Sequence, residues 1–206
     1  GTPAVRLIRI FPNAQRDTTA NTGAGADGRI NVMRLLPDGK LLIGGLFVLY
    51  NNQVARGVAR VLPDGNIDPS WQTGFGFNNE VLAIESLTDS GVLVGGFFSQ
   101  FQQLPVPQPV KLRYNGQRDT TFNAGGTGTT GLVEVMLEQP DGRILIGGSV
   151  SAYNGQPVSK LFRIFPDGTR DTSFQTGSGF STGSIRAMAL QPDGKILAVG
   201  SFTSYQ

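Results

Sequence analysis

The chain has 206 residues, 39% of them hydrophobic, and its 17 basic and 15 acidic residues give a net charge of +2. Histidine and cysteine are absent, which excludes disulfides, thiolate nucleophiles, histidine bases and Cys/His zinc sites. Because the charges are interspersed and no apolar run is long enough for a membrane helix, we expect no nucleic-acid partner and no membrane insertion.

A hairpin motif recurs four times along the chain. In the first copy, apolar residues 30–36 and 41–43 flank the turn Pro37-Asp38-Gly39. Asp-Gly between apolar segments favours a tight turn, because glycine adopts positive φ freely and aspartate bonds its own backbone. The equivalent aspartates of the four turns are Asp38, Asp89, Asp141 and Asp193. The chain is therefore predicted to consist of structural repeats.

A second motif follows each hairpin and fixes the repeat length. Its aspartates are Asp17, Asp68, Asp119 and Asp171. They recur about every 51 residues, and the four repeats together account for the whole chain. The chain is cut in mid-repeat, because residues 1–21 supply a second half and residues 185–206 supply a first half.

Within a repeat the apolar residues alternate with a period of two. Residues 185–190, 196–202 and 161–165 read as three strands, and residues 170–175 as a short fourth. No ten-residue window keeps a helical stripe, so helix is not expected. Four short strands in a unit of about 50 residues are typical of a propeller blade. The predicted fold class is thus all-β, a β-propeller of four four-stranded blades.

We expect a single domain, residues 1–206, with repeats 30–80, 81–131, 132–184, and 185–206 joined with 1–29. The N- and C-terminal halves, 5–21 and 185–202, would then close the last blade of a four-bladed ring. The competing interpretation is that the four units are an excerpt of a longer array or a larger ring, completed by a second chain.

The segments ALQPDGKILAVGSFTSY (residues 189–205) and FRIFPDGTRDTSFQTGSG (residues 162–179) resemble the bacterial delta-60 repeat family. The first two copies are looser, since Ser90-Gly91 replaces Gly-Lys after Asp89 and Ala20 stands in place of an aromatic residue. The resemblance implies a β-propeller from large secreted or surface proteins of bacteria. It therefore implies an extracellular or cell-surface location and no catalytic activity.

Two glycine-rich segments, 23–28 and 126–131, match GxGxxG but precede strands, whereas a dinucleotide site needs a helix after the motif. We interpret them as connections between repeats. The recurring aspartates supply one carboxylate per turn, too few for calcium, and are expected to close turns. No cofactor and no metal are predicted. An enzyme would require Glu85 or Glu134 to titrate abnormally, and we predict a protein that is not an enzyme.

The first strand of each repeat carries side chains whose chemistry changes from copy to copy. We expect these residues to line the channel, either solvated and paired with one another or as a ligand site. They are Asn31, Arg34, Glu85, Glu134 and Arg186.

The loop after the second strand places an aromatic residue beside a carboxamide in each copy. An aromatic face stacks on a sugar ring and an amide bonds hydroxyls, but the same residues also suit packing and turn closure. The candidate ligand-binding residues are Tyr50, Asn51, Phe101, Gln102, Tyr153, Asn154 and Tyr205.

The sequence thus predicts a non-enzymatic extracellular or cell-surface scaffold that mediates protein interaction or assembly, through a protein partner or self-association. The alternative function is a multivalent, lectin-like propeller that binds glycans.

Overall fold

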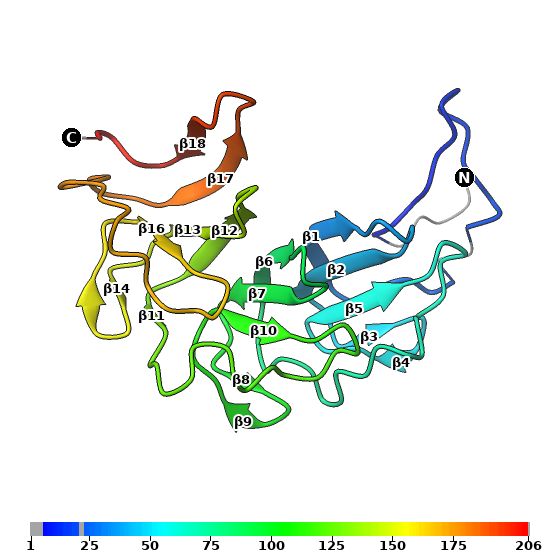
Figure 1. Ribbon diagram of the computed structural model, residues 1–206. Coiled ribbons are helices and arrows are strands. Elements are labelled where there is room, and N and C mark those ends of the chain that lie inside the picture. Colours follow the sequence, from blue (N-terminus) through cyan, green and yellow to red (C-terminus); the bar gives the residue numbers. More distant parts are fainter. Residues whose placement is uncertain (1–5, 21–22, 206) are drawn as a thin grey trace.

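The computed structural model describes residues 6–20 and 23–205, which form strands, turns and irregular segments without any helix. The expected all-β fold class is confirmed (Figure 1). The strands follow the predicted hairpins closely. The predicted strand 185–190, for example, is strand β17 (Ile185–Leu190).

The strands form four consecutive sheets, which we call units 1 to 4. Each of the first three is a three-stranded antiparallel sheet, and the fourth has two strands. Unit 1 contains β1 (Arg29–Leu35), β2 (Leu41–Leu46) and β5 (Val58–Val61). Unit 2 contains β6 (Val81–Ser86), β7 (Val92–Gly96) and β10 (Val110–Leu112). Unit 3 contains β12 (Val133–Glu138), β13 (Ile144–Gly148) and β16 (Leu161–Ile164), and unit 4 contains β17 and β18 (Ile196–Gly200).

Short hairpins project from the first three units between their second and third strands. They are β3 (Leu49–Tyr50) with β4 (Gln53–Val54), β8 (Gln100–Phe101) with β9 (Leu104–Pro105), and β14 (Ala152–Tyr153) with β15 (Gln156–Pro157). We call them the outer hairpins. Strand β11 (Thr129–Thr130) adds to the last of them.

The predicted turn chemistry is confirmed in the link between the first and second strands. The Asp38 carboxylate accepts a hydrogen bond from the Lys40 backbone N–H at 3.1 Å, and Gly39 has a φ of 81°. Asp141 does the same for Arg143 in unit 3, at 3.1 Å. These turns fix the register of each first hairpin.

Every first strand contains a register shift at the same place, between Ile30 and Val32 in unit 1. A glycine at or next to the end of the second strand lies opposite this bulge. A Cβ atom on Gly96 would overlap the carbonyl oxygen of Glu80, and the same holds for Gly45, Gly148 and Gly200 with their own bulge carbonyls. The bulge therefore accounts for a glycine that all four units share.

The units stack face to face in a curved row, with their first strands β1, β6, β12 and β17 side by side (Figure 1). Leu42 and Val58 of unit 1 pack on Val81 and Ile84 of unit 2. The next two joints repeat this arrangement with Leu93 on Met136 and with Leu145 on Ile185. Each joint buries apolar side chains that a single sheet would leave in water, so the core lies between the units.

The fourth strand, expected at 170–175 in unit 3, is reduced to one bridge between Ile164 and Arg170. The Asp171 carboxylate explains this departure, because it accepts hydrogen bonds from the N–H of Ser173 at 2.9 Å and its hydroxyl at 2.6 Å. These bonds turn the chain away from the sheet. Units 1 to 3 therefore have three hydrogen-bonded strands each rather than four.

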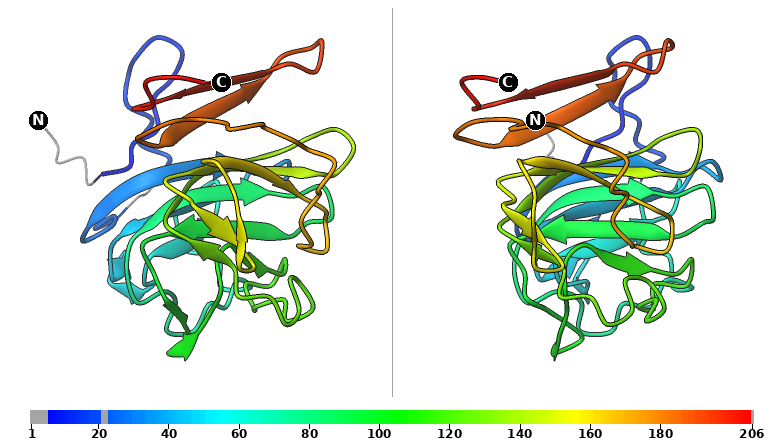
Figure 2. Two further views of the ribbon diagram at one scale, coloured as in Figure 1. Left: turned by 90° about the vertical axis from the view of Figure 1, so that its left-hand side faces the viewer. Right: turned by 60° about the vertical axis from the view of Figure 1, so that its left-hand side comes forward.

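The expected ring closure is not confirmed. Among the described residues, no pairing joins segment 6–20 to β18. Segment 6–20 lies instead on unit 1, where the Arg9 guanidinium donates to the Pro63 carbonyl at 2.6 Å and Arg6 donates to the Ala26 carbonyl at 2.6 Å. Figure 1 places segment 6–20 and unit 4 at opposite ends of the row, and Figure 2 shows β18 as its outermost strand.

Candidate functional site

The aromatic residues of the outer hairpins point into the protein. Asn51 and Asn52 both have positive φ, as do Gln102 and Gln103, which gives each hairpin a two-residue turn and aims the preceding aromatic residue inward. Tyr50, Phe101 and Tyr153 are buried. The hydroxyl of Tyr50 donates to the Gly65 carbonyl at 3.1 Å and that of Tyr153 to the Gly168 carbonyl at 2.5 Å.

Burial changes the acid–base behaviour of these two tyrosines. It raises the pKa of Tyr50 to about 12 and raises the pKa of Tyr153 still further. Their rings are covered by protein on both faces, so a stacking surface for a sugar is not present at Tyr50, Phe101 or Tyr153. They act as packing residues of the units.

The neighbouring carboxamides bind the backbone that leads into each unit. Asn51 Oδ1 accepts from the Gly25 N–H at 2.9 Å, and Asn154 Oδ1 accepts from the Gly128 N–H at 2.8 Å. Gln102 donates to the Thr73 carbonyl at 3.3 Å. These amides hold the segments that connect one unit to the next, which agrees with the interpretation that they serve packing and turn closure.

Tyr205 differs from the other candidates because its side chain is exposed, with its ring 4.7 Å from that of Phe180. The exposed apolar side chains of the outer hairpins are instead Val54 and Leu104, on the strand after each turn. Sequence reasoning missed them, since a two-residue strand gives no periodicity from which to assign its outward face.

The predicted channel residues Asn31, Arg34 and Glu85 bind across the joints between first strands. Asn31 donates to the Glu80 carboxylate and to the Val81 carbonyl, both at 2.9 Å. Arg34 forms an ion pair with Glu85, and the other Glu85 oxygen accepts from the Glu138 N–H at 3.1 Å. One carboxylate thus connects three consecutive units. Of the predicted residues, Arg34 and Glu85 pair with each other, whereas Asn31 pairs with Glu80.

The pKa of the Glu85 carboxyl is shifted upward, as an acid–base role would require. Burial raises the pKa of its carboxyl, and the Glu138 N–H and the Arg34 charge do not cancel this effect. Both of its oxygens have protein partners, however. The geometry is that of a connection between units.

The other two predicted channel residues have fewer contacts. The Glu134 carboxylate accepts from the Ser184 hydroxyl at 3.2 Å, which connects units 3 and 4. Arg186 is exposed on β17.

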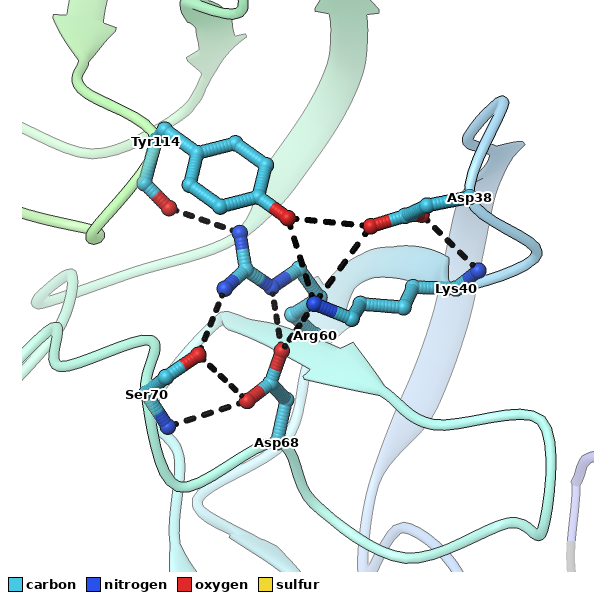
Figure 3. A network of polar contacts seen from close by, with 6 residues as sticks. All are labelled: Asp38, Lys40, Arg60, Asp68, Ser70 and Tyr114. Atoms are coloured by element: carbon cyan, nitrogen blue, oxygen red, sulfur yellow. Dashed lines mark hydrogen bonds and ion pairs between the residues drawn. The ribbon is translucent and has the colours of Figure 1, made fainter.

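The most extensive polar network lies between units 1 and 2 and is centred on Arg60 (Figure 3). Its Nε donates to Asp68 at 2.8 Å, and its two other nitrogens donate to the Tyr114 carbonyl at 2.6 Å and to Ser70 Oγ at 3.0 Å. The guanidinium lies 4.4 Å from the centre of the Tyr114 ring. Lys40 Nζ adds an ion pair to Asp68 at 3.1 Å.

The charges in this network stabilise one another. Burial alone would raise the pKa of Asp68, but hydrogen bonds from Ser70 and the charges of Lys40 and Arg60 outweigh it and hold that pKa well below its usual range. The arginine–aspartate pair recurs as Arg9 with Asp17 and as Arg163 with Asp171, always eight residues apart. This spacing was a visible signal of the network in the sequence.

Unit 2 departs from the pattern, with Lys111 in place of the arginine. Lys111 Nζ binds Asp89 at 2.5 Å.

A cavity of about 380 Å³ lies beside the Arg60 network, lined by Asp38, Arg60, Leu87 and Tyr114 among others. Because all three Arg60 nitrogens already have acceptors, the network fits a joint between units better than a binding site for an anion.

The described residues contain no cluster of three or more histidine, cysteine, aspartate or glutamate side chains able to hold a metal ion. In the same part of the chain, no helix is long and apolar enough to cross a membrane.

Three segments, residues 36–70, 139–174 and 191–206, match a family model described as a domain of unknown function (DUF5122) beta-propeller. Each begins at or near the turn between the first and second strands of units 1, 3 and 4. The chain contains β-propeller repeats. A search of curated proteins finds no match.

The matched propeller repeats include the Arg60–Asp68 and Arg163–Asp171 pairs and their turns. The equivalent part of unit 2 lies outside the matched segments. This agrees with its differences from the other units, Ser90 in place of the turn glycine and Lys111 in place of the arginine. What the matched segments of units 1 and 3 share is therefore the part of the unit from the first turn to the arginine–aspartate pair.

Proposed function

We propose that the chain is a non-enzymatic scaffold, a row of four propeller blades of the delta-60 type that mediates protein interaction or assembly. The recurring joint between units supports this proposal best. Polar side chains such as Arg34, Glu85 and Arg60 are engaged by neighbouring units, which favours a rigid framework over a reactive site.

The surface offered to a protein partner is the rim of outer hairpins. Val54 and Leu104 are exposed at equivalent places on two of them. The resemblance to delta-60 repeats favours an extracellular or bacterial cell-surface location for this contact.

A photoreactive residue at position 104 tests the rim on intact bacterial cells that produce the protein. We expect a specific crosslinked partner that Val54→Glu abolishes and Phe97→Glu preserves, since Phe97 is exposed at the end of β7, away from the hairpin turns. A crosslink pattern unchanged by Val54→Glu contradicts the proposal.

The exposed ring of Tyr205 favours the lectin-like alternative at one position. Saturable binding to a glycan array that is lost in Tyr205→Ala, with thermal stability unchanged, supports it. Binding that persists in that variant removes this alternative.

A further inference from the structure

We propose that the cavity between units 1 and 2 binds an uncharged sugar ring, which stacks on Tyr114 and accepts and donates hydrogen bonds to the hydroxyl groups around it. This inference goes beyond the scaffold function and does not rest on it. The site is also distinct from Tyr205, because it lies at the joint between two neighbouring units.

The cavity combines apolar surface with hydroxyl groups. Its volume of about 380 Å³ lies within the range of about 300–1,000 Å³ that is usual for small-molecule sites. Apolar side chains from both units form part of its wall, among them Leu36 and Val92. Tyr114 supplies the one aromatic ring among the described residues that line it, and Ser86 and Ser90 supply hydroxyls. This combination matches a pyranose, which has an apolar face of C–H groups and hydroxyls around its edge.

The ring of Tyr114 is fixed in place by its protein contacts (Figure 3). Its hydroxyl donates to Asp38 at 2.9 Å and accepts from Lys40 Nζ at 3.2 Å. The Arg60 guanidinium lies 4.4 Å from the ring centre and covers one face, yet Tyr114 is 48% exposed. The remaining ring surface can therefore stack on a ligand without first being ordered, which reduces the entropy lost on binding.

Unit 2 departs from the repeat pattern at three residues that line this cavity. Tyr114 and Thr88 each replace a proline that the equivalent turns share, and Ser90 replaces a shared glycine. The shared residues are Pro12, Pro63 and Pro166 for Tyr114, Pro37, Pro140 and Pro192 for Thr88, and Gly39, Gly142 and Gly194 for Ser90. Each of the three replacements adds a hydroxyl group to the lining of the cavity.

The equivalent place one joint earlier shows the same cavity without these replacements. Between segment 6–20 and unit 1 lies a cavity of about 210 Å³, lined by Leu35, Gly39 and Pro63 among others. These three residues hold the positions of Ser86, Ser90 and Tyr114. The cavity between units 1 and 2 is thus larger, and it has hydroxyl groups where the other has apolar side chains or none.

Ser90 holds its hydroxyl beside the cavity at a cost in stability. Its φ of 66° is a conformation that glycine adopts freely and that is unfavourable for serine. Strained backbone of this kind is typical of ligand sites. In the described part of the chain, neither Ser86 nor Ser90 forms a side-chain hydrogen bond. Both hydroxyls can therefore donate to and accept from a ligand.

The charges beside the cavity are balanced, which favours an uncharged ligand. The charged side chains of its described lining are Asp38 and Arg60. Asp38 pairs with Lys40 at 3.4 Å, and Arg60 pairs with Asp68 at 2.8 Å. A charged ligand would find no unpaired counter-charge among these groups. The hydroxyls of a sugar, in contrast, can donate to the remaining lone pairs of the partly exposed Asp38 carboxylate.

Saturation-transfer NMR with a panel of methyl pyranosides tests the proposal on the 206-residue chain. The probes are the methyl glycosides of glucose, galactose, mannose and N-acetylglucosamine, and we expect at least one of them to give a saturable signal. The fluorescence of Trp71, the chain's single tryptophan, gives a second readout, because its ring lies 5.7 Å from the Arg60 guanidinium.

Tyr114→Pro is the decisive variant, because the repeat itself shows that proline fits this turn. The carbonyl of Pro63, at the equivalent position, accepts from Arg9 at 2.6 Å, as the Tyr114 carbonyl accepts from Arg60 at 2.6 Å. The variant therefore keeps the contact to Arg60 and removes the ring. We expect binding to weaken about tenfold or more, since the stacking surface is lost. Tyr114→Phe keeps the ring and is expected to retain the signal.

Ser90→Gly gives a readout that a purely structural role would not move. It restores the glycine of the other units and relieves the positive φ, so thermal stability is expected not to fall. Binding of the sugar probe is expected to weaken, because one hydroxyl of the cavity is removed. Phe97→Ala removes another exposed aromatic ring of unit 2 and is the matched control, with binding unchanged.

Two results overturn the proposal. One is a wild-type chain that gives no saturable signal with any probe of the panel. The other is a signal that persists unchanged in Tyr114→Pro, which places the sugar at another aromatic residue such as Tyr205. Neither result affects the crosslinking test at position 104, so failure of this site is distinguishable from failure of the scaffold function.

Discussion

Arg60 carries its charge inside the joint between units 1 and 2, where it is 2% exposed. A buried guanidinium is tolerated only when its charge and its donors are matched, and Asp68, Ser70 and the Tyr114 carbonyl supply both. The residue therefore fixes how unit 1 meets unit 2, because Asp68 and Ser70 follow the last strand of unit 1 and Tyr114 follows the last strand of unit 2.

Removing the carboxylate tests this view. Asp68→Ala leaves Arg60 buried without its counter-charge, and we expect the free energy of unfolding to fall by about 3–5 kcal/mol at neutral pH. The equivalent change at the exposed pair of Asp193 and Lys195 is expected to cost much less, because solvent screens that pair. Denaturant unfolding of both variants measures the difference, and equal costs contradict the assignment.

The pH dependence of Asp68→Ala has a definite sign. Because the folded-state pKa of Asp68 is depressed, its contribution to stability is complete above the unfolded-state value, near 4. It is lost as the pH falls through the folded-state value. The difference between wild type and variant is thus expected to shrink on acidification below about pH 4. A difference that does not change with pH contradicts the ion pair.

At the scale of the element, the bulged first strand and the glycine opposite it behave as one motif. Gly96→Ala forces a Cβ into the Glu80 carbonyl oxygen, which cannot move without disturbing the β6–β7 pairing. We expect a loss of about 3 kcal/mol in unfolding free energy, at the upper end of the cost of overpacking.

Gly125→Asn is the matched control, because Gly125 has a φ of 75° but nothing within 4 Å of its Cβ position. Asparagine tolerates this conformation, so its cost is expected to stay within about 0.5 kcal/mol. Thermal and denaturant unfolding of the two variants measure the contrast. Similar losses contradict the steric explanation.

Strands with a clear period of two could be predicted from the sequence, and β17 has the predicted bounds. The turns could be predicted from Asp-Gly. The burial of Tyr50 and Tyr153 could not, because two-residue strands give no alternation from which to choose the inner side. The Arg60 network was not predicted, because arginine is usually exposed. The separation of eight residues between Arg60 and Asp68 nevertheless recurs in the chain.

At the scale of the whole molecule, stability is distributed along the row of units. Units 2 and 3 are covered on both faces, whereas the end faces carry the exposed Met33 and Leu197. Each end unit therefore lacks the burial of one joint, which lowers the free energy of its local opening.

Amide hydrogen exchange measures this difference. In the 206-residue chain we expect the amides of β17 and β18 to exchange through local opening, and those of β6 and β7 only through global unfolding. Uniform protection in all four units contradicts a row stabilised joint by joint.

Ring closure could not be decided from the repeat count. It depends on the rotation between neighbouring units at each joint. That rotation is set by close packing, such as the backbone of Gly44 against the Val81 side chain, rather than by the number of residues in a repeat. Small differences in that rotation add up along the row.

Val199 stands where units 1, 2 and 3 have Gly44, Gly95 and Gly147, and this difference has a consequence for how such a chain evolves. A Cβ on Gly44 would lie 2.6 Å from Val81 of the following unit, so a copy of unit 4 transplanted to an internal position would drive its valine into that neighbour. The order of the units is therefore encoded in their sequences, and they are not interchangeable modules. Gene duplication can lengthen the row at its ends, but an internal insertion requires compensating substitutions on both adjoining surfaces.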